Sequence, residues 1–180
     1  MTASIAPVVT GLPPVIPAAC RLLVLGSLPG NRSLAARQYY AHPQNQFWRL
    51  MGMVTGESLS GLPYDSRLAA LDRHKIGLWD VIATARRASS LDGDIQQAVS
   101  NPLASLITNL PGLRAVACNG ALAAKLATRQ LGGQLGRQAD ASAVPLLALP
   151  SSSPANTQAF AAKAELWQAL REFLALPTEG

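Results

Sequence analysis

Four short apolar runs, separated by stretches with helical spacing, constrain the fold of this chain more than any other feature. They occupy residues 21–26, 76–82, 115–118 and 145–149. Short continuous apolar runs are typical of strands buried on both faces, as in a parallel sheet. Strands that alternate with helices favour a sheet covered on both sides. The sequence therefore predicts an α/β fold, a three-layer α/β/α sandwich with a small, mostly parallel central sheet.

Apolar residues recur at helical spacing in the intervening segments 47–54, 68–74 and 121–131. A last helix is predicted by the spacing of apolar residues from Phe160 to Leu174. Ser153 followed by Pro154 is a helix-start signal, because serine caps the first turn and proline fits inside it. We therefore expect the last helix to begin at Ser153.

The chain is expected to form one domain. Its 180 residues suffice for one substantial core. Four prolines among residues 1–18 predict a flexible N-terminal arm, which leaves 19–176 as the single domain. The apolar run at 144–149 is too short to span a bilayer, and the N-terminus lacks a signal-peptide pattern. We expect a cytoplasmic protein without a membrane partner, associated with the nucleoid if the source is prokaryotic.

Cysteine and histidine are too sparse for a metal cofactor. Cys20 and Cys118 lie beside apolar runs and are interpreted as buried, reduced thiols. Four thiolates would be needed for an iron–sulfur cluster held by cysteine alone. His42 and His74 have no nearby cluster of further zinc ligands. We therefore expect no cofactor, no metal and no iron–sulfur cluster.

Basic residues are unevenly distributed. The formal net charge is +5, and 12 of the 15 basic residues are arginine. No acidic residue precedes Glu57, and none lies between Gln96 and Ala139. Arginine suits phosphate because its planar guanidinium makes paired contacts. A solvated basic surface explains the charge equally well, so composition permits nucleic-acid binding without establishing it.

Three polar segments follow predicted strands and share the sheet edge where ligands of such folds bind. The first is Gly26-Ser-Leu-Pro-Gly30, followed by Gln38-Tyr-Tyr-Ala-His-Pro-Gln-Asn-Gln-Phe-Trp48. The second is Ala117-Cys-Asn-Gly120, and the third is Leu149-Pro-Ser-Ser-Ser-Pro-Ala-Asn156. In order, these segments resemble the motifs of the uracil-DNA glycosylase superfamily, over roughly residues 22–174. They are most similar to the hypoxanthine-DNA glycosylase branch, family 6, and also resemble mismatch-specific uracil and thymine DNA glycosylases.

The resemblance includes one informative departure. Mismatch-specific relatives carry asparagine at the third position of the first turn and uracil-specific ones aspartate, whereas this chain has Leu28. Family 6 similarity implies that Asn45 is the catalytic residue instead. A carboxamide can position water and interact with charge that develops as the glycosidic bond breaks. Asn45 also precedes a predicted helix, where it would serve as an N-cap. A lone His42 before proline is interpreted as a turn residue, with acid–base chemistry as the alternative.

The resemblance also implies a base-binding set. Tyr40 matches the aromatic residue that stacks on the flipped base, with half-buried packing and Tyr39 as the alternatives. Asn119 offers a donor and an acceptor to a base edge, or else forms a strand-end turn. Backbone amides of the first turn would approach the base or a phosphate. The base-binding residues predicted in this way are Gly26, Ser27, Leu28, Tyr40 and Asn119.

A further set is expected to contact DNA. The resemblance implies that residues 151–156 form the loop that enters the duplex. The helix predicted to begin there would add the positive end of its dipole, and Ser153 would cap that helix. Arg86 and Arg87 are candidates for holding the backbone, or else form a solvated pair. The predicted DNA-binding residues are Ser151, Ser152, Ser153, Pro154, Asn156, Arg86 and Arg87.

The predicted activity is that of a monofunctional DNA glycosylase. We expect the protein to be a monomer. It would flip a deaminated base out of DNA, hypoxanthine first, and leave an abasic site for base-excision repair. No lysine lies within the three motifs to form a Schiff base. The alternatives are a uracil or thymine mismatch glycosylase, a nucleotide-binding Rossmann-like enzyme, and a catalytically silent DNA-binding protein. Residue chemistry leaves the choice among hypoxanthine, uracil and xanthine open, as it does single- versus double-strand preference.

Overall fold

A four-stranded parallel sheet forms the centre of the protein, seen in a computed structural model that describes residues 6–132 and 144–175. Its strands, in the order β3-β2-β6-β7, are Ile76–Asp80, Leu22–Gly26, Ala115–Asn119 and Leu146–Leu149. Register places Gly26 beside Asp80 and Asn119 beside Leu149. All four strands run in one direction, so their carboxyl ends meet at one edge, as the sequence predicts.

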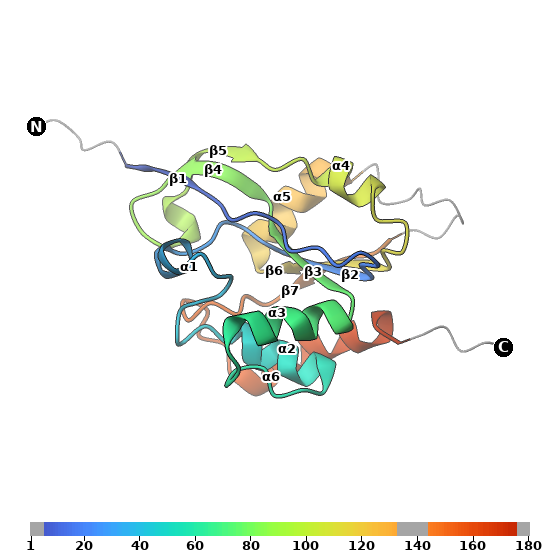
Figure 1. The fold of residues 1–180 in the computed structure, drawn as a ribbon. Coiled ribbons are helices and arrows are strands. Elements are labelled where there is room, and N and C mark those ends of the chain that lie inside the picture. The colour runs from blue at the N-terminus through green and yellow to red at the C-terminus, as the bar shows by residue number, and fades with distance from the viewer. Residues whose placement is uncertain (1–5, 133–143, 176–180) are drawn as a thin grey trace, which may run out of the picture.

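Helices cover both faces of this sheet (Figure 1). One face carries α2 (Phe47–Thr55), α3 (Tyr64–Arg73) and α6 (Phe160–Gln168), which continues into the 3₁₀ turn η2 (Ala169–Phe173). The other carries α4 (Leu103–Thr108) and α5 (Ala121–Leu131). Leu22 and Val24 belong to the core on the α2 side, whereas Leu23 belongs to the core on the α5 side. The expected three-layer arrangement is confirmed.

A second sheet, which the sequence analysis missed, flanks the first. It is antiparallel, in the order β1-β4-β5, with strands Val8–Thr10, Ile82–Arg86 and Gln96–Ser100. The apolar run 76–82, expected as one strand, therefore divides at Val81 between two sheets. The 3₁₀ turn η1 (Asp92–Asp94) lies between β4 and β5, and α1 (Asn31–Ala36) follows the first motif turn.

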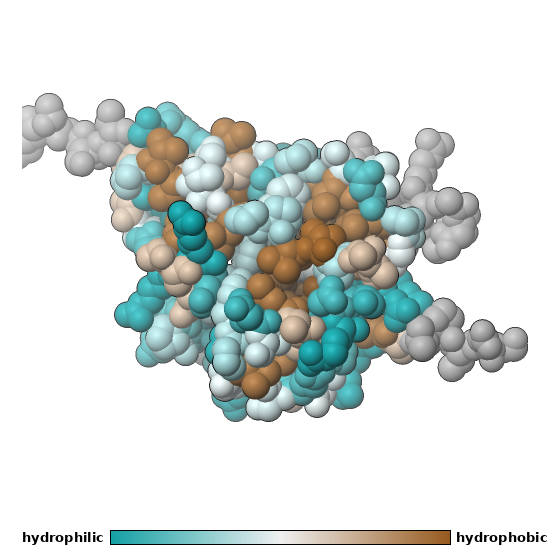
Figure 2. All heavy atoms as spheres, viewed as in Figure 1, coloured by the Kyte–Doolittle hydropathy of each residue, from teal (hydrophilic) through white to brown (hydrophobic). Residues whose placement is uncertain are grey.

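The expected flexible arm of residues 1–18 is wrong for its described part, residues 6–18. β1 pairs with β4, and Val15 exchanges backbone hydrogen bonds with Leu78 of β3. Leu12 and Val15 also pack against the core. On the face drawn in Figure 2, apolar residues gather across the middle, where this segment crosses the molecule. The prolines therefore shape an ordered crossing strap, and residues 1–5 lie outside the described residues.

The start of the last helix also differs from the prediction, because α6 begins at Phe160 rather than at Ser153. Ser153 and Asn156 instead close local turns: Ser153 Oγ accepts from the Ala155 N–H, and Asn156 Oδ1 accepts from the Gln158 N–H. Such side-chain-to-backbone bonds compete with helix formation. The serines therefore form a loop ahead of the helix. No helix in the described ranges is long and apolar enough to cross a membrane.

Candidate active site

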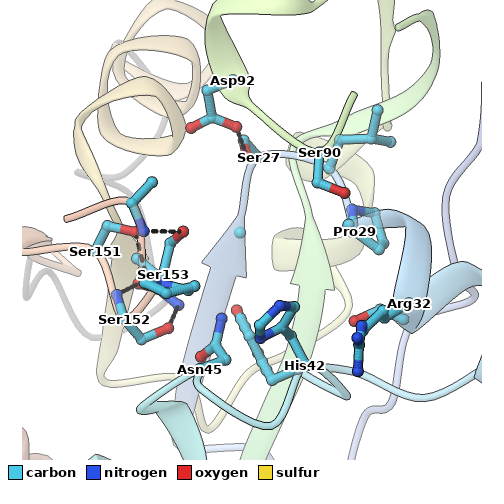
Figure 3. Close-up of a pocket in the computed structure, with 18 of the residues that line it drawn as sticks. Ser27, Pro29, Arg32, His42, Asn45, Ser90, Asp92, Ser151, Ser152 and Ser153 are labelled. Atoms are coloured by element: carbon cyan, nitrogen blue, oxygen red, sulfur yellow. Dashed lines mark hydrogen bonds between the residues drawn. The ribbon is translucent and has the colours of Figure 1, made fainter. Parts of the chain in front are cut away.

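A cavity of about 800 Å³ opens at the carboxyl ends of β2, β3 and β6. Parallel strands bring their ends to one edge, so motifs far apart in sequence meet there. Figure 3 shows Asn45 and His42 at one end, Ser27 and Asp92 at the other, and the three serines of the third motif along one side. The sequence-predicted residues that line it are Gly26, Ser27, Leu28, Tyr40, Asn45, Asn119, Ser151, Ser152, Ser153, Pro154 and Asn156.

Asp80, which the sequence analysis missed, is a buried carboxyl in the cavity wall. It ends β3, is 3% exposed, and its Oδ2 has no hydrogen-bond partner in the part of the chain described. Burial raises its pKa to about 7; Arg87 opposes the rise and Asp92 adds to it. The only sequence signal was a charged residue ending an apolar strand, which is where sites of this fold class gather.

Gly26 makes room for the Asp80 carboxyl. A Cβ at this position would lie 2.5 Å from Asp80 Oδ1 and 3.2 Å from the Tyr40 hydroxyl oxygen. The first separation is well inside van der Waals contact, so a side chain at position 26 would displace one of these groups. Gly26, Asp80 and Tyr40 therefore form a close-packed group in the cavity wall.

Tyr40 adopts a left-handed backbone conformation, φ 54°, that non-glycine residues seldom use. Its ring stacks on Phe47, with centroids 3.7 Å apart and planes 17° from parallel. Burial, and then the nearby Asp80, raise the pKa of Tyr40, so its hydroxyl stays protonated. Tyr39 is 3% exposed, and its hydroxyl donates to the Pro13 carbonyl at 2.9 Å. Tyr40 is thus the better placed of the two for a ligand.

Asn45 lines the cavity and also bonds to the first residue of α2, although the N-cap of that helix is Gln46 and not Asn45. Its Oδ1 accepts from the Phe47 N–H at 2.9 Å, which identifies Nδ2 as the other end of the carboxamide. Figure 3 shows that nitrogen turned into the cavity. His42 lies beside it, and its Nδ1 accepts from the Gln44 N–H at 3.1 Å, so a neutral ring carries its proton on Nε2. Asn45 and His42 therefore both present donors.

Asn119 uses its carboxamide to hold the third motif. Oδ1 accepts from the Ser152 N–H and Nδ2 donates to Ser152 Oγ, each at 2.8 Å. Both residues are buried, with Asn119 9% exposed and Ser152 fully enclosed. These paired bonds join the ends of two motifs. The carboxamide oxygen and nitrogen of Asn119, which were expected to bond to the edge of a base, therefore already have partners within the protein.

Lys163 of α6 fixes the same loop from behind. It is 1% exposed and donates to the Asn156 carbonyl at 2.8 Å and to Gln46 Oε1 at 3.0 Å. The Gln46 N–H donates to the Ser152 carbonyl at 2.9 Å. These hydrogen bonds therefore hold the loop 151–156 against Gln46, the residue next to Asn45, although no helix begins within the loop.

The predicted surface role of Arg87 needs correction. Arg87 is 2% exposed and donates to the carbonyls of Leu28 and Pro29, so it supports the first motif turn from inside. Arg86 bonds to Gln97 and to a carbonyl of the crossing strap. Neither lines the cavity. Sequence alone cannot distinguish an arginine that bonds turn carbonyls from one that faces solvent.

Two neighbouring residues complete this wall. The Leu28 side chain packs with Ile82 and Ala85 in a small core between the sheets, so its backbone rather than a polar group faces the cavity. Arg32 is exposed and does line the cavity, on the side of Pro29 and Ser90 (Figure 3). In the described ranges, no three His, Cys, Asp or Glu residues lie close enough to hold a metal ion.

Comparisons with known proteins agree on one family. Residues 13–172 match the model of the uracil DNA glycosylase superfamily. A hypoxanthine DNA glycosylase from Methanosarcina barkeri is 46% identical over 110 residues, covering 61% of this chain and 70% of that protein. Another hypoxanthine DNA glycosylase, from Methanosarcina acetivorans, is 34% identical over 160 residues, which cover 89% of this chain and 96% of that protein. The solution structure of a candidate uracil DNA glycosylase from M. acetivorans superposes with a TM-score of 0.81, at 33% identity, covering 94% of this chain and all of that one.

Proposed function

The chain belongs to the uracil DNA glycosylase superfamily and is a DNA glycosylase that acts on deaminated bases, and we propose that hypoxanthine is the base it excises. Both curated relatives carry that base in their names. The observation that carries the proposal is the meeting of all three motifs around one cavity that also contains Asp80. A base can reach the Asp80 carboxyl in the cavity wall only after it leaves the stack of the duplex.

Asp80 is proposed to bind the edge of the flipped base in its neutral form. A protonated carboxyl has one donor and one acceptor, which match the ring N–H and carbonyl oxygen of a lactam. An ionised carboxylate would instead face the lactam oxygen with like partial charge. The unpartnered Oδ2 and the raised pKa of Asp80 both support the neutral form. Hypoxanthine, xanthine and uracil all present a lactam, as do guanine and thymine, whereas adenine and cytosine do not. The contact therefore separates hypoxanthine and uracil from the adenine and cytosine from which deamination produces them.

Tyr40 and Asn45 are proposed to act on the ring and on the bond that breaks. Tyr40 lines the cavity and Phe47 covers one face of its ring, so we assign the base to the other face. Such stacking is worth roughly 1–3 kcal/mol per base. Asn45 donates from Nδ2 to the departing base, where negative charge collects as the C1′–N bond lengthens. Water then adds its oxygen to C1′ and keeps one proton as the new hydroxyl group, while its other proton goes to the departing base.

The reaction is proposed to stop at the abasic site. Strand cleavage by a bifunctional glycosylase needs an amine that attacks C1′, and none of the described lysines lines the cavity. Lys163 is nearby, but both of its contacts are to oxygen atoms inside the fold. DNA is held by the loop 151–156 and by Arg32, which we assign the phosphate contact first expected of Arg86 and Arg87.

All of these groups come from one chain, and we propose that a monomer performs the reaction. Because the substrate is DNA, we place the protein in the cytoplasm, at the nucleoid in a prokaryotic cell.

The test is excision from end-labelled duplexes that carry one hypoxanthine, uracil or xanthine, in low salt without added metal. We expect the strand to be cleaved at hypoxanthine, and to be cleaved there only after treatment with alkali. Cleavage without alkali would contradict a monofunctional reaction, and cleavage at uracil alone would favour the uracil or thymine mismatch activity. Binding of all three duplexes without excision would favour a silent DNA-binding protein.

Two substitutions separate the two roles of Asn45. Asn45→Ala removes both the hydrogen bond to the Phe47 N–H and the cavity donor, whereas Asn45→Asp keeps an oxygen for the Phe47 N–H and removes only the donor. The loss of one such hydrogen bond costs about 1 kcal/mol of stability. We expect both variants to lose excision but only the alanine variant to melt earlier. An active Asn45→Asp enzyme would show that the donor is not the catalytic feature.

A further inference from the structure

Leu91 is an exposed apolar residue on the rim of the cavity. Its side chain is 54% exposed, and it is one of the residues that line the cavity. It lies between β4 and β5, immediately before η1. A lone exposed leucine needs no explanation on an ordinary surface. At the mouth of a cavity that receives a base from DNA, however, it is positioned to touch the duplex.

The residues on either side of Leu91 hold it at this rim. Ser90 Oγ accepts from the Asn31 N–H at 2.9 Å, at the start of α1. Asp92 Oδ1 accepts from the Ser27 hydroxyl at 2.6 Å, in the first motif turn (Figure 3). The Leu91 N–H itself donates to Ser89 Oγ at 3.0 Å. Leu91 is therefore presented by a short loop that is fastened to the cavity wall on both sides.

The opposite side of the cavity offers no comparable side chain. Residues 151–156 are three serines, a proline, an alanine and an asparagine. Figure 3 shows the three serines on one side of the cavity and Ser90, the neighbour of Leu91, on the other. When a nucleotide flips out, the stack loses a flat apolar surface, and enzymes that distort DNA commonly fill such gaps with apolar side chains. Small polar residues fill that space poorly.

Charge indicates which part of the DNA the Leu91 loop meets. Asp92 and Asp94 follow Leu91 in the sequence, and their carboxylates would repel phosphates. Arg32, also on the cavity wall, is suited to phosphate. The loop with Leu91 therefore fits over the base stack rather than over the sugar–phosphate backbone.

We propose that Leu91 inserts into the duplex from the side opposite residues 151–156 and occupies the stacking space that the flipped nucleotide leaves. This inference rests on the proposed glycosylase function. It makes Leu91 a contact to DNA that matters only where a stack must be opened and held open. A single-stranded substrate has no such requirement.

The test compares Leu91→Ala with Leu166→Ala, a matched control of similar exposure, 51%, on α6 and away from the cavity. Excision of hypoxanthine is measured under single-turnover conditions from a duplex and from the same strand alone. We expect Leu91→Ala to slow duplex excision about tenfold or more, equivalent to about 1.4 kcal/mol, with single-strand excision unchanged. Leu166→Ala should change neither rate, and Leu91→Met should restore most of the duplex rate.

A second measurement follows insertion directly. A 2-aminopurine placed next to the hypoxanthine should brighten when wild-type enzyme unstacks it, and less with Leu91→Ala. Equal duplex rates for Leu91→Ala and wild type, or an equal loss on both substrates, would overturn the inference while leaving the glycosylase function in place. A wild-type enzyme that excises hypoxanthine from neither substrate would instead refute the proposed function.

Discussion

Replacement of Asp80 by asparagine should remove the pH dependence of excision without removing excision. The Asp80 carboxyl has a pKa of about 7, raised by burial. If the neutral form binds the base, about nine-tenths of the enzyme is competent at pH 6 and about one-tenth at pH 8. Asparagine has nearly the same shape and keeps one donor and one acceptor for the lactam at every pH.

The assay is single-turnover excision of hypoxanthine from pH 5.5 to 9. We expect the wild-type rate to fall about tenfold between pH 6 and pH 8, whereas Asp80→Asn stays level and within a few-fold of the wild-type rate at pH 6. Asp80→Ala should be slow throughout, by about 10- to 100-fold, because the lactam loses both partners. His42→Gln, a change in the same wall, should leave the wild-type pH dependence in place.

Two results would refute this reasoning. A wild-type rate that rises through pH 7 would mean that Asp80 works as a carboxylate. An Asp80→Asn enzyme that is inactive at pH 6, yet melts at the wild-type temperature, would mean that the charge or basicity of Asp80 is required. Either outcome would leave the glycosylase activity standing and remove Asp80 from base recognition in its neutral form.

The remaining predictions concern stability, packing and DNA contact. The folded-state pKa of Asp80 is raised from 3.8 to about 7. The free energy of unfolding of the wild type should therefore fall as the pH rises between these values, by at most on the order of 4 kcal/mol. The melting temperature of the wild type should fall with it, whereas that of Asp80→Asn should change less over the same pH range. Gly26→Ala should reduce excision at least about tenfold by displacing Asp80, whereas Gly93→Ala, where a Cβ meets nothing within 4 Å, should not. Arg32→Ala should weaken duplex binding and lower the slope of log affinity against log salt concentration by about 1. Arg129→Ala, on α5, serves as the surface control. Equal slopes for the two variants would contradict a phosphate contact by Arg32.

Much of the scaffold follows from local pattern. Short continuous apolar runs, spaced by helical periodicity, predict a parallel sheet with two helical layers, and the structure has that sheet. Parallel strands end at one edge, so motifs at strand ends can be expected to meet before any coordinate is known. Asn45 is an example, since it lines the cavity as its motif implied. The expected N-cap role falls one residue later, on Gln46, and Asn45 bonds to the Phe47 N–H from the position before it.

Other features depended on contacts between distant segments. No local pattern in 76–82 shows that the chain changes sheets at Val81, because that choice depends on where β1 and β5 pair. Arg87 is polar in sequence but buried, since the carbonyls of the first turn, 58 and 59 residues earlier, accept its hydrogen bonds. The serine loop is not a helix start, because Asn119 and Lys163 hold it from elsewhere in the fold.

The sequence by itself therefore determined the layers, the family and the meeting place of the motifs, all of which rest on periodicity and on strand direction. Only the tertiary structure decided the chemical state of the groups at that place. How strongly the Asp80 carboxyl is desolvated, whether Arg87 reaches solvent and whether Leu91 is exposed depend on burial, and burial is a property of segments packed from all along the chain. Desolvation then changes the protonation of a carboxyl in a way that residue type alone does not reveal.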